Sequence, residues 1–363
     1  MGIDTGTHPA ALRGAPIEWA TLERILAVRL DNLGDVILAG PALRALRAAA
    51  PRARLDLLTS PAGAAAAGLL GCVDDVRAAS VPWQDADGRP VDPADLHRLA
   101  DGLAARAYQA AVILTSFSQS PWPAAFTCAL ARIPIRAGVS REFGGSLLTH
   151  WVDGLPDGLH QADRAAELLV RLGVAVPDRA LRVVVPAAAG RTARRLAGAA
   201  PYAVLLPGAS CPARRYPARH FADLAGLLAA AGLRVLVCGT AREGPLVEQV
   251  RAGAGTRGVG MAGVVDLATL AALLAHARIT VTNNSGGMHV ADAVGAPLVA
   301  LFAGTERESE YRPRSRGARL LRRPTECAPC RAFDCPVGHH ACLDLPPATV
   351  AAAALSVGAP RAA

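Results

Sequence analysis

The stretch Arg24-Ile-Leu-Ala-Val-Arg-Leu30, followed directly by Asp31-Asn-Leu-Gly-Asp-Val36, decides the fold of this chain. Its apolar residues predict a buried strand that ends in a tight loop with a carboxylate beside glycine. Gly40-Pro41 then opens an Ala/Leu/Arg helix that runs to Ala50, because proline is tolerated in the first helical turn. A strand, a loop and a helix in this order predict the first unit of a parallel α/β sheet.

This pattern places Asp35 at the carboxyl end of the first strand. Open parallel sheets bind their ligands at that edge, so Asp35 is a candidate catalytic carboxylate. Aspartate also caps the amino ends of helices, and the spacing alone does not separate a helix cap from a catalyst.

Short apolar segments alternate with helical segments along the rest of the chain. Strands are expected at residues 25–30, 54–58, 111–114, 202–206, 233–238, 278–281 and 298–302. Helices are expected at residues 93–106, 162–172, 218–231, 246–252 and 267–277. This alternation predicts an α/β fold of two Rossmann-like domains, with parallel sheets facing a central cleft.

The length of 363 residues suits two domains. We expect a mobile tail at 1–20, a first domain at 21–175, a linker at 176–189 and a second domain at 190–345. A helix and tail follow at 346–363. The linker is predicted from lost helical periodicity and two prolines after residue 172.

The net charge of +8 comes from arginine, since the sequence contains no lysine. This charge favours acidic ligands such as nucleotides, phosphorylated glycolipids or an anionic membrane face. The arginines are scattered without interleaved aromatics, which argues against nucleic acid. No apolar run reaches the roughly 18 to 20 residues that span a bilayer, and the first residues lack the apolar core of a signal peptide. We therefore expect a cytoplasmic protein with at most a peripheral contact with the inner membrane face.

Two loops in the second half are candidate phosphate sites. Pro207-Gly-Ala-Ser210 ends an apolar strand and precedes Arg214-Arg215. Small residues allow close approach of a diphosphate, an arginine neutralises it, and Ser210 donates a hydrogen bond. Pro-Gly loops also serve simply to turn the chain.

The second loop, Asn283-Asn-Ser-Gly-Gly-Met-His289, again leads from a strand into a helix. Free N–H groups at a helix amino end bind anions, and Ser285, Gly286 and Gly287 are small enough to admit a phosphate. His289 follows about one turn later. A lone histidine is equally well explained as a packing residue.

The segment from Cys327 to Cys342 contains four cysteines and two histidines in sixteen residues. Its Cys-x-x-Cys pair is a common half-site, so Cys327, Cys330, Cys335 and Cys342 are candidate ligands of structural zinc or iron. The alternative is a reduced turn that packs without metal. The other four cysteines are scattered, which is typical of buried thiols in a reducing compartment.

In this order and separation, the motifs resemble glycosyltransferase family 9, the ADP-heptose heptosyltransferases of lipopolysaccharide core assembly and their relatives. The resemblance covers about residues 24–350. It is carried by Arg29-Leu-Asp-Asn-Leu-Gly-Asp-Val-Ile-Leu-Ala-Gly-Pro-Ala-Leu43, by Leu206-Pro-Gly-Ala-Ser210 with Arg214 and Pro217, and by the loop at 283–289. It implies a GT-B fold and inverting transfer of a sugar, a heptose from ADP-heptose, to a hydroxyl of a glycan or glycolipid, with no catalytic metal.

The resemblance also implies a role for each site residue. Asp35 matches the general base, in an acceptor-side first domain whose loop includes Asp31, Asn32 and Gly34. Asp31 is the reserve base, although bracing of the loop explains it more simply. The second domain becomes the donor domain, and its donor residues are Ser210, Arg214, Asn284, Ser285, Gly286, Gly287 and His289. Some autotransporter-modifying relatives carry iron at a similar cysteine cluster.

The sequence departs from the family at three positions. Asn284 stands where many relatives have aspartate, Asn32 where arginine is frequent, and Leu38 where some lipopolysaccharide enzymes have histidine. Asn284 favours one alternative, a non-catalytic nucleotide-sugar-binding or assembly protein with a metal-stapled tail. A GT-B nucleotide-sugar epimerase is the second alternative, and the first loop argues against it. A Rossmann dehydrogenase is disfavoured, because no Gly-x-Gly-x-x-Gly follows the first strand.

Overall fold

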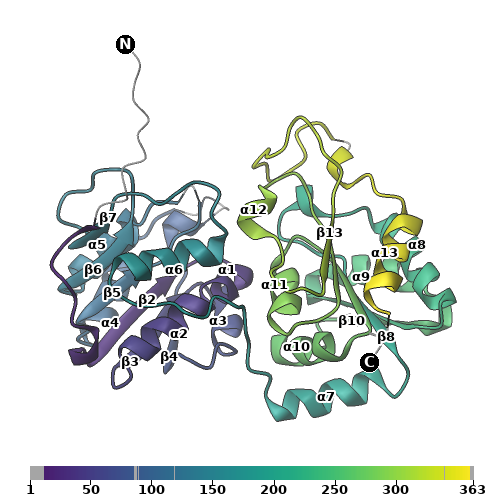
Figure 1. Ribbon diagram of the computed structural model, residues 1–363, viewed down its shortest axis with the longest axis horizontal. Helices are drawn as coiled ribbons and strands as arrows, with labels where there is room; N and C mark the ends of the chain where they lie inside the picture. Colours follow the sequence, from purple (N-terminus) through teal and green to yellow (C-terminus); the bar gives the residue numbers. More distant parts are fainter. Residues whose placement is uncertain (1–11, 86–87, 89, 118, 339, 360–363) are drawn as a thin grey trace. The chain divides into compact units, whose positions relative to one another are not determined.

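The computed structural model describes residues 12–85, 88, 90–117, 119–338 and 340–359. The chain divides into two compact units, Met1–Arg179 and Ala180–Ala363. Each unit is an α/β domain built on its own sheet (Figure 1). The division lies within the linker expected at 176–189, and the first helix of unit 2, α7 (Ala187–Ala197), begins before that linker was expected to end.

Unit 1 contains a sheet in the order β1-β7-β6-β5-β2-β3-β4. Every pair is parallel except β1 with β7. The strands are β1 (Leu12–Arg13), β2 (Arg24–Arg29), β3 (Arg54–Thr59), β4 (Asp75–Ala78), β5 (Ala110–Ile113), β6 (Ile135–Val139) and β7 (His150–Val152). The helices are α1 (Leu33–Leu38), α2 (Gly40–Ala49), α3 (Pro61–Ala67), α4 (Pro93–Ala104), α5 (Trp122–Leu130) and α6 (Gln161–Arg171). Short 3-10 turns are η1 (Trp19–Thr21) and η2 (Pro82–Gln84).

The central strand β2 explains why the sequence folds in this way. Its residues from Ile25 to Val28 are almost completely buried, as expected of a parallel strand covered on both faces. Leu26 and Val28 join a cluster with α4 and α5 on one face. The chain runs from β2 outward through β3 and β4, and then returns to place β5 on the other side of β2. The strand order therefore reverses between β2 and β5, which is where open α/β sheets form ligand sites.

Unit 2 contains a fully parallel sheet in the order β10-β9-β8-β11-β12-β13. The strands are β8 (Tyr202–Leu206), β9 (Arg234–Gly239), β10 (Gly258–Ala262), β11 (Ile279–Asn283), β12 (Leu298–Leu301) and β13 (Ala318–Leu321). After α7 come α8 (Ala218–Ala230), α9 (Gly244–Gly253), α10 (Leu267–His276), α11 (Gly286–Ala293), α12 (Glu308–Tyr311) and α13 (Pro347–Val357). Residues of α8, α9 and α13 form one core with the sheet, and the strand order reverses between β8 and β11.

The expected tail at 1–20 differs from the structure in its second part, while residues 1–11 lie outside the described residues. Leu12 and Arg13 pair with β7, and Trp19 is buried with its indole N–H donating to the Leu172 carbonyl at 3.0 Å. Residues 12–20 are therefore folded rather than a mobile tail. A two-residue strand and one aromatic residue are too short to produce a periodic sequence signal.

The tight loop expected after the first strand is instead the helix α1, which begins at Leu33. Asp35 lies in the first turn of this helix. The N-cap position belongs to Asn32, so the interpretation of Asp35 as the cap is wrong. Of the helices in the described parts of the chain, none is long and apolar enough to cross a membrane.

Candidate functional site

Arg29 organises the polar cluster at the strand-order reversal of unit 1. It ends β2 and is 1% exposed. Its Nη2 donates to Asp35 Oδ1 at 3.1 Å and to Ser116 Oγ at 2.6 Å. Its Nε lies 3.1 Å from Asp31 Oδ2, an ion-pair contact in which the N–H is not aimed along a hydrogen bond. A buried guanidinium is tolerated because two carboxylates compensate its charge.

Asp35 is held from one side and partly exposed. Besides the contact with Arg29, it accepts a hydrogen bond from Ser116 Oγ at 3.4 Å. Its side chain keeps 19% of its accessible surface. A carboxylate that is oriented by a buried cation and still reachable from solvent is suited to accept a proton from a bound hydroxyl.

Asp31 is much more tightly enclosed than Asp35. Its side chain is 6% exposed, pairs with Arg29, and accepts a hydrogen bond from Gln119 Nε2. Its carbonyl accepts from Ser60 Oγ at 2.5 Å. These contacts support bracing of the loop rather than a role as the reserve base. The side chain of Asn32 makes no capping bond, and Gly34 is buried within α1.

Three residues of this cluster were not assigned a role from the sequence: Arg29, Ser116 and Gln119. Ser116 and Gln119 follow β5, which lies beside β2 although 81 residues separate Asp35 from Ser116. Arg29 itself was the feature of the sequence that could have indicated this cluster, because a charged residue in a buried strand needs partners of opposite charge.

In unit 2, Asn283 joins the loops after β8 and β11. It is fully buried, and its Nδ2 donates to the Pro207 carbonyl at 2.8 Å. Its Oδ1 accepts from the Tyr216 N–H at 3.0 Å. The two loops that the sequence singled out thus lie together at the strand-order reversal of this sheet. Asn283 was quoted within its motif, but its linking role was not predicted.

Arg214 reaches a third loop, the one after β12. Its Nη2 pairs with Glu306 Oε1 at 2.6 Å, and its Nε donates to Thr305 Oγ1 at 3.1 Å. Arg215 instead donates from Nε to the Ala209 carbonyl at 2.8 Å and so holds its own loop. Ser210 is exposed.

The small residue Gly208 lies directly against a carboxylate of the protein. A Cβ at this position would lie 1.9 Å from Glu243 Oε1. Glu243 is itself fixed in a capping box with Thr240. A larger residue at this position would displace the Glu243 carboxylate from its capping box, whether or not a phosphate approaches the loop.

The loop after β11 combines buried and accessible residues. Asn284 is 2% exposed; its Oδ1 accepts from the Ala303 N–H at 3.0 Å, while its buried Nδ2 has no hydrogen-bond partner within the described chain. Ser285 is the N-cap of α11 without a side-chain cap bond, and Gly286 and Gly287 form its first turn. His289 is buried, and its ring centroid lies 6.4 Å from that of Tyr311, which supports a packing role.

The cysteine segment packs against the loops that follow β8 and β12. Cys211 Sγ and the Ala213 N–H both donate to the Phe333 carbonyl, at 2.9 and 3.0 Å. The Cys330 N–H donates to the Gly304 carbonyl at 2.9 Å. Residues 327–342 are therefore tied to the loops that contain Ser210 and Thr305.

Cys342 is the most enclosed thiol of the cysteine segment for which a pKa shift is resolved. Burial raises the pKa of the Cys342 thiol, and charge on Cys335, Cys327 and Cys330 raises it further. Charges act over longer distances than metal bonds, however, and no three metal-binding side chains in the described residues are close enough to hold one ion. His339 lies outside that part.

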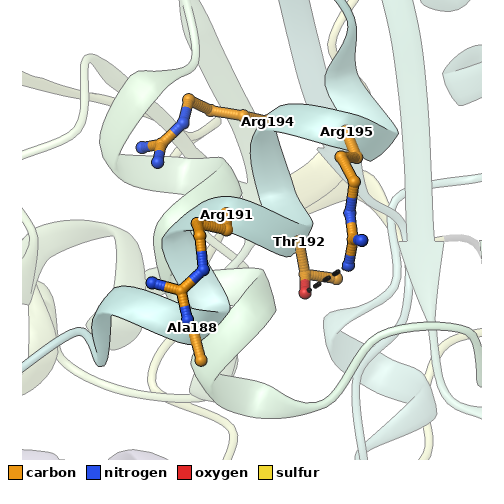
Figure 2. A pocket seen from close by; sticks show the side chains of 5 residues that line it. All are labelled: Ala188, Arg191, Thr192, Arg194 and Arg195. Atoms are coloured by element: carbon orange, nitrogen blue, oxygen red, sulfur yellow. Dashed lines mark hydrogen bonds between the residues drawn. The ribbon is translucent and has the colours of Figure 1, made fainter.

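Helix α7 presents a basic surface (Figure 2). Arg191, Arg194 and Arg195 are exposed and line a hollow of about 450 Å³ together with Ala188 and Thr192. Arg195 Nη2 donates to Thr192 Oγ1 at 3.3 Å. The described lining of this hollow contains no acidic residue.

Three known proteins show what the chain is similar to. Lipooligosaccharide heptosyltransferase 2 of Haemophilus influenzae is 37% identical over 123 residues, which are 32% of this chain and 35% of that protein. The alignment thus spans about a third of the relative. The structure of Escherichia coli ADP-heptose lps heptosyltransferase II superposes with a TM-score of 0.74 at 23% identity, over 92% of this chain and 98% of that one.

The third is the iron-containing dodecameric glycosyltransferase TibC from enterotoxigenic E. coli. It has a TM-score of 0.55 at 16% identity, over 93% of this chain and 76% of that one. The structural likeness, together with the two parallel sheets, confirms the GT-B fold class predicted from the sequence. The sequence model of glycosyltransferase family 9 (heptosyltransferase) matches residues 96–341, more than half of the chain. The chain therefore belongs to glycosyltransferase family 9.

Proposed function

We propose that this protein transfers a sugar from a nucleotide-diphosphate donor to a hydroxyl of a glycan or glycolipid. Asp35 removes the proton of the acceptor hydroxyl as its oxygen attacks the anomeric carbon. The bond from that carbon to the diphosphate breaks in the same displacement, so the configuration inverts. The observation that carries this proposal is the Asp35 carboxylate, which Arg29 and Ser116 hold while part of it stays exposed.

The donor site of this proposal lies in unit 2. The departing diphosphate gains negative charge, which Arg214, Ser210 and the amino end of α11 would stabilise. These groups supply positive potential without a catalytic metal. Family membership and the relatives' names support ADP-heptose as the donor. The buried Asn284 would position the loop through its bond to Ala303, alongside Ser285, Gly286, Gly287 and His289.

Incubation of the purified protein with ADP-heptose tests this function. We expect ADP to be released when a glycan acceptor is present and much more slowly without one. A binding or assembly protein would bind the donor without releasing ADP, and an epimerase would alter the donor sugar without needing an acceptor. Either result would contradict the proposed transfer.

Arg214 should determine much of the affinity for the nucleotide. Replacing it with Gln is expected to weaken ADP binding about ten- to hundredfold, since hydrogen bonds to charged groups are worth about 1.5–3 kcal/mol. Glu306→Gln should not weaken ADP binding, because it removes the counter-charge on Arg214. Isothermal titration calorimetry measures both. Arg215→Gln is the control, and an equal loss in this variant would remove Arg214 from the phosphate site.

We also propose that the cysteine cluster holds a structural zinc or iron. Four thiols within sixteen residues are a suitable donor set. TibC is described as iron-containing, which supports the same group in this chain. The distances in the structure do not fit a bound ion as they stand, so binding would draw the side chains together. Because this segment is bonded to the loops after β8 and β12, the metal would stiffen the donor side.

Metal analysis of freshly prepared protein tests this proposal. We expect about one zinc or iron per chain. Cys327→Ala/Cys330→Ala should lose the metal, whereas Cys72→Ala, which alters an unrelated buried thiol, should keep it. A stoichiometry near zero in unchelated wild-type protein would contradict the proposal.

We further propose that the protein works in the cytoplasm and contacts the inner membrane face peripherally. The eight cysteines are free, which supports a reducing compartment. The three exposed arginines of α7 suit an anionic lipid surface, where each basic residue contributes about 1 kcal/mol (Figure 2). This contact would bring the enzyme to a glycolipid acceptor.

A further inference from the structure

Arg331 joins the cysteine segment to the helix α12. Its Nη2 donates to both carboxylate oxygens of Glu310, at 2.9 Å and 2.7 Å. Glu310 belongs to α12 and is 2% exposed, whereas the side chain of Arg331 is 42% exposed. A buried carboxylate needs a compensating cation, and within the described residues Arg331 is the one ion-pair partner of Glu310.

The backbone of Arg331 holds the loop after β12 at a second place. Its N–H donates to the Thr305 carbonyl at 3.0 Å, and Thr305 is 2% exposed. The stretch 305–310 is thus bonded to Arg331 at both of its ends, through the backbone of Thr305 and through the side chain of Glu310.

The side chain of Thr305 contacts Arg214, the proposed diphosphate ligand. Thr305 Oγ1 accepts from Arg214 Nε at 3.1 Å, and Glu306 Oε1 accepts from Arg214 Nη2 at 2.6 Å. The bond at Nε fixes the plane of the guanidinium, whose terminal N–H groups can then donate to a diphosphate. A ligand binds more tightly to a side chain that is already oriented, because less conformational entropy is lost on binding.

We propose that Arg331 is a positioning residue for donor binding. It holds the loop after β12, through Glu310 and the backbone of Thr305, in the place where Thr305 orients Arg214. The proposal rests on the proposed function, because it concerns the donor affinity of that site. Arg331 acts through Arg214 and not through a contact of its own with the donor, so its replacement should affect binding only when Arg214 is present.

Calorimetric titration of the full chain with ADP tests this inference. Arg331→Met removes the cation and leaves Glu310 uncompensated. We expect ADP affinity to fall about three- to tenfold, because interaction energies between residues of one network usually correspond to changes of this size. This loss is smaller than the one expected for Arg214→Gln, since the guanidinium of Arg214 is still present but less well oriented.

A double-mutant cycle separates positioning from a general loss of structure. When Arg214→Gln is already present, Arg331→Met should have almost no further effect on ADP affinity, because no guanidinium is left to orient. Arg331→Lys should restore most of the affinity that Arg331→Met loses, because lysine keeps the charge that compensates Glu310.

Thr305→Val tests the same chain of contacts without touching the buried ion pair, and so applies even if Arg331→Met does not fold. Valine has nearly the shape of threonine but cannot accept the hydrogen bond from Arg214 Nε. ADP affinity should fall about two- to tenfold, the usual effect of one lost hydrogen bond. This loss should also disappear when Arg214→Gln is present.

Arg323→Met is the matched control, because Arg323 pairs with Asp344 at the surface of the same unit, with side chains that are 58% and 62% exposed. It should leave ADP binding unchanged. The inference is overturned if folded Arg331→Met or Thr305→Val binds ADP as well as Arg323→Met does, if the losses add to that of Arg214→Gln, or if Arg331→Lys restores nothing. Absence of ADP binding in the wild type would instead contradict the proposed function, so the two proposals fail on different measurements.

Discussion

Asp35→Asn is expected to reduce turnover by about 10²- to 10⁴-fold, the usual contribution of a general base. The amide keeps the shape of the side chain but cannot take the proton of the acceptor hydroxyl. ADP affinity should stay close to that of the wild type, because the proposed diphosphate contacts lie in unit 2. The measurement is ADP release at saturating donor and acceptor, paired with calorimetric titration of ADP.

Asp31→Asn is the informative comparison for this result. Asp31 is enclosed by Arg29 and Gln119, so its replacement should disturb the loop and cost less turnover than Asp35→Asn. Circular dichroism and thermal melting should show that both variants are folded. A folded Asp35→Asn enzyme with near-normal turnover would exclude Asp35 as the base, and a larger loss in Asp31→Asn would transfer that role to Asp31.

The fold was predictable wherever strands are continuously apolar. The strands β2, β3, β5, β8, β9, β11 and β12 were all expected close to their observed positions, because a parallel strand buried on both faces needs such a run. The edge strand β4, Asp75–Ala78, has two charged residues and no apolar run. It is a strand because β3 offers a partner, which is a tertiary cause that no local pattern expresses.

The candidate site was predictable as separate loops and not as a network. Asp35, Ser210 and Asn284 were found from residue types at strand ends. The partners that fix them, such as Ser116 for Asp35 and Glu306 for Arg214, come from loops 81 and 92 residues away. Such pairings depend on strand order, and the sequence pattern predicted parallel strands without giving their order. Gly208 shows a further contact of this kind, because the loop in which it was singled out packs against Glu243, 35 residues away.

Arg29→Met should destabilise unit 1 by about 3–5 kcal/mol, the cost of removing one partner from a buried ion pair. Methionine fills a similar volume, but the carboxylates of Asp31 and Asp35 then face each other without the buried cation. All four tryptophans of the chain, Trp19, Trp83, Trp122 and Trp151, belong to unit 1, so their fluorescence during urea denaturation reports this unit. Tryptophan fluorescence therefore follows the unfolding of unit 1 alone, so the two domains need not be fitted as one two-state transition.

Two variants separate a buried electrostatic effect from a general loss of arginine. Arg98→Met removes a guanidinium of α4 that is paired with Asp95 on the surface, where both side chains are 65% exposed. This substitution should lower the free energy of unfolding by about 1 kcal/mol or less. Asp31→Asn added to Arg29→Met should recover part of the lost stability, because it removes one uncompensated carboxylate. Two results would show that the buried guanidinium does not hold this cluster together. One is an Arg29→Met variant that loses no more unfolding free energy than Arg98→Met, and the other is a double variant, Arg29→Met/Asp31→Asn, that is less stable than Arg29→Met alone. Asp35 would then be oriented by contacts other than the one with Arg29, since the hydrogen bond from Ser116 Oγ, at 3.4 Å, is long for a hydroxyl donor.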